Sequence, residues 1–197
     1  MLAIQNQALN TCDGRVMDKN KILETFAKID DNLESSAALC LYGSGAFILL
    51  DEENRTSLDL DIAAPYSRVD FPDFNRAVEA AGLSINPEES TNSDHIEWVS
   101  IARLCLADPS TTESFVLWEG NKLKVSTVSP ADLIASKLIR YDEIDQSDIH
   151  YLVFQMNITF ESIVQAVERL PETFRKDMMI VENLANLERD ILSWKRI

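Results

Sequence analysis

The sequence predicts an α+β protein, in which a mixed β-sheet is flanked by helices and followed by a C-terminal helical half. Short apolar or alternating runs, which are typical of strands, recur between residues 37 and 128, with helical spacing between several of them. After Ser129 the apolar residues keep helical spacing to the end of the chain. Strands gathered in one part of a chain and helices in another favour the α+β class.

The predicted elements begin after a lead-in, residues 1–17, that has no clear periodicity. Apolar side chains three or four positions apart predict an amphipathic helix over 17–33. The apolar run 37–42 predicts a buried strand, because it is bounded by serines and by a glycine. Residues 46–50 then predict a short helix that packs on the core.

A turn at 51–54 leads into strict alternation at 58–62, which predicts a strand with Leu58 on its apolar face. Residues 70–82 have the pattern of a second amphipathic helix, with Gly82 as its stop.

The ranges 96–106, 115–118 and 122–128 predict further strands, the last two joined by a hairpin turn at 119–121. Ser129 and Pro130 have the positions of a cap and a first-turn proline, so a helix should start there.

The following region is expected to be helical with breaks near Asp142, Asn157 and Pro171. We therefore divide the chain into the lead-in, an α/β core at 18–129 and a helical region at 130–197 packed on the core.

Composition limits the classes of function. The 197 residues carry 33 acidic and 18 basic side chains, a formal net charge of −15. Such a surface disfavours extended binding of nucleic acid and would attract a basic protein partner. Cys12, Cys40 and Cys105 are widely spaced, and no apolar run approaches the length of a membrane span. We expect a cytoplasmic protein with reduced, mostly buried thiols and no membrane association.

The most informative pattern is Gly43-Ser44-Gly45, followed fifteen residues after Ser44 by alternating Leu-Asp-Leu-Asp-Ile. Residues two apart in a strand share a face, so Asp59 and Asp61 should project together. Two adjacent carboxylates suit a hard divalent cation such as Mg²⁺ or Mn²⁺, which also binds substrate phosphates. The glycine-rich turn would present backbone N–H groups to those phosphates. Together they predict phosphoryl or nucleotidyl transfer.

A plainer interpretation is a solvated edge strand with two surface aspartates. An acidic chain contains such pairs by chance, and Glu143 and Asp145 repeat the spacing.

The order of these motifs resembles the nucleotidyltransferase fold of the DNA polymerase β superfamily, and within it the small bacterial families related to AbiEii-type abortive-infection and toxin–antitoxin proteins. The resemblance covers about residues 20–155. It rests on the apolar strand with Gly43-Ser44, the string from Arg55 to Asp61, and the later segments Asp132 to Leu138 and Arg140 to Leu152.

The resemblance implies a role for each matching residue. Asp59 and Asp61 would bind the divalent ions, while Gly43 and Ser44 would hold the β- and γ-phosphates of a nucleoside triphosphate. Lys137 would reach the same phosphates.

Three further roles have plainer alternatives. Arg55 would clamp a phosphate, or else be a surface charge paired with Asp51 or Glu52. Asp148 would orient Lys137 or the acceptor, or else would cap a helix or lie on a helix surface. The alternative for Lys137 is an exposed lysine with no role in the site.

The sequence also departs from the family pattern, in which a neighbouring strand supplies a third carboxylate. The strand at 122–128 offers Lys124 and Ser126 instead of an acid. Glu97 and Glu119 are substitutes, although neither is expected within an alternating strand.

The expected function is Mg²⁺-dependent transfer of a nucleoside monophosphate from a nucleoside triphosphate to an unknown acceptor, within a toxin–antitoxin or phage-defence system. The alternative is a catalytically silent protein of the same fold, acting as an antitoxin, a regulatory partner or a nucleotide sensor. In either case a cognate toxin or antitoxin is the expected protein partner.

Overall fold

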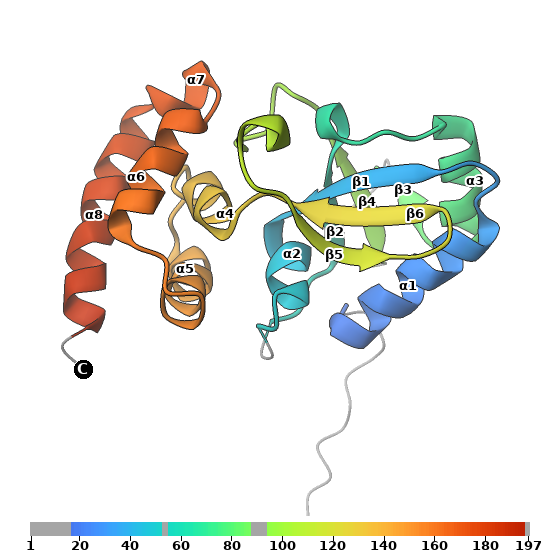
Figure 1. Cartoon of the computed structure of the whole chain (residues 1–197), viewed down its shortest axis with the longest axis horizontal. Coiled ribbons are helices and arrows are strands. Elements are labelled where there is room, and N and C mark those ends of the chain that lie inside the picture. Colours follow the sequence, from blue (N-terminus) through green and yellow to red (C-terminus); the bar gives the residue numbers. More distant parts are fainter. Residues whose placement is uncertain (1–16, 53–54, 88–93, 196–197) are drawn as a thin grey trace, which may run out of the picture.

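The computed structural model describes residues 17–52, 55–87 and 94–195. It confirms the α+β class, because a mixed sheet with helices against it is followed by a part of the chain that is helical (Figure 1). The predicted lead-in lies outside the described residues except for Met17, which is fully buried and forms a backbone bridge with Ser57.

The described residues form a six-stranded sheet in the order β3-β4-β2-β1-β6-β5. The strand β1 is central and pairs antiparallel with β2 and parallel with β6, while β2 pairs parallel with β4. The strands are β1 (Ala37–Tyr42), β2 (Asp59–Ala63), β3 (Ser84–Ile85), β4 (His95–Val99), β5 (Phe115–Glu119) and β6 (Leu123–Thr127).

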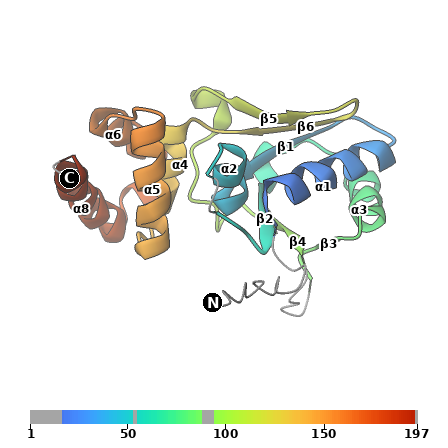
Figure 2. The same cartoon turned by 90° about the horizontal axis from the view of Figure 1, so that it is seen from below.

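The helices fall into two groups along the chain. Those of the sheet region are α1 (Lys19–Asn32), α2 (Gly43–Leu49) and α3 (Phe71–Ala80). Those that follow are α4 (Pro130–Lys137), α5 (Glu143–Gln155), α6 (Phe160–Arg169), α7 (Glu172–Arg175) and α8 (Met178–Trp194). Figure 2 shows the second group gathered at one end of the sheet, with α2 nearer to it than α1 and α3 are.

Side-chain caps explain where several helices begin. Ser129 accepts a hydrogen bond from the backbone N–H of Asp132, as the serine-proline start predicted. Aspartate caps start the helices α1, α3, α5 and α8 in the same way, through Asp18, Asp70, Asp142 and Asp177. The predicted break near Asp142 is therefore the cap of a new helix.

Three predicted boundaries were wrong. The strand expected over 96–106 ends at Val99, because the chain turns at 100–103 and Leu104 to Ala107 are buried without joining the ladder. The strand β2 begins at Asp59, and Leu58 is 58% exposed rather than on the apolar face. The helix expected at 46–50 begins earlier, at Gly43.

The core contains the apolar face of the sheet and of the helices around it. Cys40 and Cys105 are buried free thiols, as predicted. Trp118 packs against Phe26, with ring centroids 6.0 Å apart. Among the described residues, no helix is both long enough and apolar enough to cross a membrane.

The helices α2 and α5 join the two groups of helices. The Tyr151 hydroxyl donates to the carbonyl of Leu50 at 3.3 Å. The ammonium of Lys137, at the end of α4, lies 4.7 Å from the ring centroid of Phe47 on α2. The segment that carries the predicted glycine turn is thus packed against the C-terminal helices.

Candidate functional site

Three carboxylates cluster on one face of the sheet. Asp59 and Asp61 project to the same side of β2, as predicted, while Leu60 and Ile62 between and after them are fully buried. Asp61 stands opposite Glu97 in the parallel register of β2 and β4. Oxygen atoms of Asp59, Asp61 and Glu97 all lie within 4.8 Å of one another. This spacing and this all-oxygen donor set fit a hard divalent cation.

Glu97 occupies the place of the third carboxylate. It lies within a strand, contrary to expectation, and that strand is the neighbour of β2. The strand β6, where an acid was sought, pairs with the other side of β1 and cannot contribute. Glu119 is also excluded, because β1 and β6 separate its strand from β2.

Ser57 is a site residue that sequence reasoning did not assign. Its buried hydroxyl donates to Oδ1 of Asp59 at 3.1 Å, which fixes the direction of that carboxylate. Its position two residues before Asp59 was the available signal, because a hydroxyl there can reach the next side chain on the same face.

The glycine turn lies directly beside the acids. Tyr42, the last residue of β1, is paired with Asp61. Gly43 has φ +61°, and a Cβ placed on it would lie 2.9 Å from Cγ of Asp61 and closer still to one of its oxygens. Only glycine combines this backbone conformation with this approach. The predicted juxtaposition of the turn and the acid pair is therefore present.

The carboxylate cluster holds excess negative charge. Burial, followed by the carboxylates of Asp59 and Glu97, raises the pKa of Asp61 to about 7, although Lys137 and Arg103 oppose the shift. A bound cation would remove this penalty, since it stabilises the ionised form of all three acids.

A second group of charges is buried behind the turn. Lys137 is 8% exposed and its ammonium lies 2.6 Å from Asp148 and 2.8 Å from Asp145, both 1% exposed. The interpretation of Lys137 as an exposed lysine was therefore wrong, and so was a surface or capping role for Asp148. Asp148 contacts Lys137 directly, as its orienting role requires.

Arg55 links this buried group to the turn. Its guanidinium lies 3.1 Å from Asp148 and donates to the Ser44 hydroxyl at 2.6 Å. The alternative pairing of Arg55 with Asp51 or Glu52 is not observed: Lys19 binds Asp51, and the Arg55 guanidinium contacts Asp148 and Ser44. The residues Ser44, Arg55, Lys137 and Asp148, which were predicted to share a site, are thus connected by direct contacts.

A cavity of about 220 Å³ opens beside the turn. Its lining includes Tyr42 and Gly43 together with three cationic side chains, those of Arg103, Lys137 and Arg140. One carboxylate, that of Asp145, also lines it and pairs with Lys137 and Arg140. Cationic side chains outnumber acidic ones in this lining, which favours a phosphate-bearing ligand.

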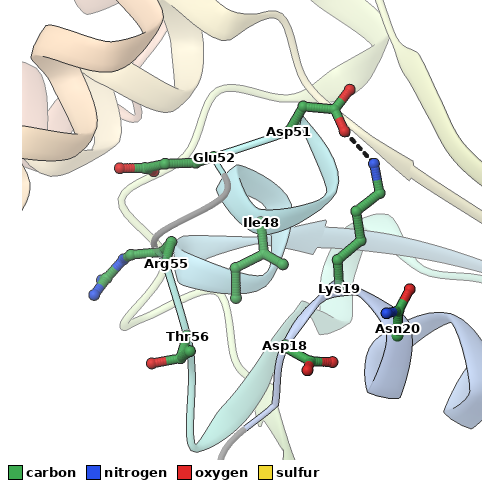
Figure 3. A pocket seen from close by; sticks show the side chains of 8 residues that line it. All are labelled: Asp18, Lys19, Asn20, Ile48, Asp51, Glu52, Arg55 and Thr56. Atoms are coloured by element: carbon green, nitrogen blue, oxygen red, sulfur yellow. Dashed lines mark hydrogen bonds and ion pairs between the residues drawn. The ribbon is translucent and has the colours of Figure 1, made fainter. Parts of the chain in front are cut away.

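A different cavity, of about 320 Å³, lies at the far end of α2 (Figure 3). Lys19 and Asp51 are ion-paired at its rim, and Arg55 is the one predicted site residue in its lining. The carboxylate cluster does not contribute to it, so we do not assign the predicted chemistry there.

No family model, curated protein or solved structure matches this chain. The candidate site is consequently defined by its geometry.

Proposed function

We propose that the chain is a Mg²⁺-dependent nucleotidyltransferase that moves a nucleoside monophosphate from a nucleoside triphosphate to an acceptor hydroxyl. The observation that carries the proposal is the cluster of Asp59, Asp61 and Glu97 beside Gly43. The family resemblance of the sequence motifs supports the same reaction class. The third carboxylate, which the sequence seemed to lack, adds further support.

The residues present fit a divalent ion by their donor atoms, which are carboxylate oxygens that all lie within 4.8 Å of one another. Mg²⁺ held by Asp59, Asp61 and Glu97 would neutralise charge on the triphosphate and on the attacking oxygen. In the reaction, the bond between the α-phosphorus and the bridging oxygen breaks while the acceptor oxygen forms a new bond to that phosphorus. Pyrophosphate leaves, and a carboxylate of the cluster takes the acceptor proton.

The chain's own residues would position the triphosphate. The bare backbone at Gly43 lets the Asp61 carboxylate lie directly against the turn, so that the turn and the proposed metal ligands are adjacent. Lys137 lines the cavity next to the turn, and Asp145 and Asp148 hold its ammonium in place and balance its charge. Arg55 in turn holds the Ser44 hydroxyl. Most of the rate enhancement in such reactions comes from positioning and charge neutralisation.

The test is transfer of label from each [α-³²P]nucleoside triphosphate to total RNA or to a panel of proteins. The wild-type protein should label an acceptor in the presence of Mg²⁺, and the Asp59→Asn/Asp61→Asn variant should not. Glu119→Gln is the matched control, because it removes an acid from the same sheet but outside the cluster. Equal labelling by the double variant would contradict the proposal.

The second candidate is a silent nucleotidyltransferase-like protein that acts as an antitoxin, a regulatory partner or a nucleotide sensor. The observation that favours it is the formal net charge of −15, which suits a basic protein partner. It predicts co-purification of a basic protein, or saturable nucleotide binding, without release of pyrophosphate.

A further inference from the structure

Arg103 holds one carboxylate of the cluster. Its guanidinium donates to Oε1 of Glu97 at 2.6 Å. The same side chain lines the cavity beside Gly43 and Lys137. Arg103 therefore contacts both regions that the proposed reaction needs, the carboxylates on one side and the cationic cavity on the other.

The backbone of Arg103 is anchored while its side chain is exposed. Its N–H donates to the carbonyl of Ser100 at 3.0 Å, which closes a turn. The next residue, Leu104, is fully buried and starts an apolar segment that holds the chain in place. The Arg103 side chain is 70% exposed, so it can change partners without moving the core.

A guanidinium and a divalent cation compete for the same carboxylate oxygens. The Arg103–Glu97 pair is exposed and correspondingly weak. A divalent ion bound by three carboxylates has twice the charge and more ligands, so it displaces the guanidinium from Glu97. The released guanidinium can then bind phosphate through two parallel hydrogen bonds, a geometry that matches its planar shape.

We propose that Arg103 is an exchangeable counter-ion of the carboxylate cluster: it neutralises Glu97 when no metal is bound, and it binds the substrate phosphates when the metal replaces it. This inference rests on the proposed function and makes substrate binding at that site depend on the metal. Metal and triphosphate would then bind cooperatively, because the metal releases the guanidinium that the triphosphate accepts.

The test measures, by calorimetry, the binding of Mn²⁺ alone and the binding of inorganic tripolyphosphate to protein already saturated with Mn²⁺. Arg103→Ala should bind Mn²⁺ about two- to fivefold more tightly than wild type, since the competing cation is gone. The same variant should bind tripolyphosphate more weakly. Lys176→Ala is the control, because it removes an equally charged, exposed side chain whose ion-pair partner in the described part of the chain is Glu172.

The direction of the change separates this proposal from a purely structural role. If Arg103 merely held Glu97 in place, the variant would bind Mn²⁺ more weakly, and that result or an unchanged affinity would overturn the proposal while leaving the metal site intact. If neither wild type nor variant bound Mn²⁺, the proposed function would fail as well.

Discussion

Asp61 and Glu97 are directly opposite each other on the parallel strands β2 and β4. Their carboxylate oxygens and those of Asp59 lie within 4.8 Å of one another. Parallel pairing fixes this relationship, because residues in register on neighbouring strands project to the same face. The strand partner of β2 thereby completes an all-oxygen site. On the other side of β2, the end of β1 brings Tyr42 and Gly43 next to Asp61.

Gly43→Ala should damage both stability and the site. Alanine at φ +61° is strained, and its methyl group would meet the Asp61 carboxylate. We expect a loss of about 2–4 kcal/mol in the free energy of unfolding, measured by urea denaturation.

Gly82→Ala is the matched control for this variant. Gly82 also has positive φ, but its Cβ would meet nothing within 4 Å, so only backbone strain of about 1 kcal/mol remains. An equal loss of unfolding free energy in the two variants would show that Asp61 does not crowd Gly43.

Lys137→Met should destabilise the fold strongly. It leaves Asp145 and Asp148, both buried, without their shared ammonium. Removal of one partner from a buried ion pair costs about 3–5 kcal/mol when the remaining charge is uncompensated. We expect a loss at the lower end of this range, because Arg140 and Arg55 still contact the two acids. Lys176→Met breaks an exposed pair instead and should cost less than about 0.5 kcal/mol. Similar unfolding midpoints for the two variants in urea would contradict the buried network.

Stability should fall as the pH rises through neutrality. Burial and the nearby Asp148 raise the pKa of Glu52 to about 7 from its ordinary 4.5. The folded protein therefore keeps a proton that the unfolded chain releases near pH 4.5. This contribution to stability is fully present below pH 4.5 and is lost above pH 7.

Thermal unfolding of metal-free protein between pH 5 and pH 8 checks this expectation. The free energy of unfolding should fall by about 2 kcal/mol because of Glu52. Asp61, whose pKa is raised in the same direction, should add to this decrease. Glu52→Gln stays neutral and should show a shallower fall. A variant with the same pH profile as wild type would show that Glu52 does not titrate in this range.

The local patterns were sufficient for much of the fold. Alternation placed Asp59 and Asp61 on one face, the serine-proline pair marked the start of α4, and the apolar run 37–42 formed β1. These features depend on residues within a few positions of one another.

The remaining features depend on pairing between distant segments. Nothing near Glu97 in the sequence indicates that its strand pairs with β2 rather than with β6. The burial of Lys137 likewise follows from Asp145 and Asp148 on the next helix, since a charged side chain is buried only where partners compensate it. The apolar run after Val99 read as a strand because periodicity cannot distinguish a buried extended segment from one that joins a ladder.

The proposed reaction depends on Asp59, Asp61 and Glu97 holding a divalent cation together. Calorimetric titration of Mn²⁺ into the wild type and into Asp59→Asn, Asp61→Asn and Glu97→Gln measures this property. Each substitution should weaken binding by at least about tenfold, because each removes a charged ligand, while Glu119→Gln should bind like the wild type. Wild-type affinity in the Glu97→Gln variant, or no binding by the wild type, would contradict the proposal.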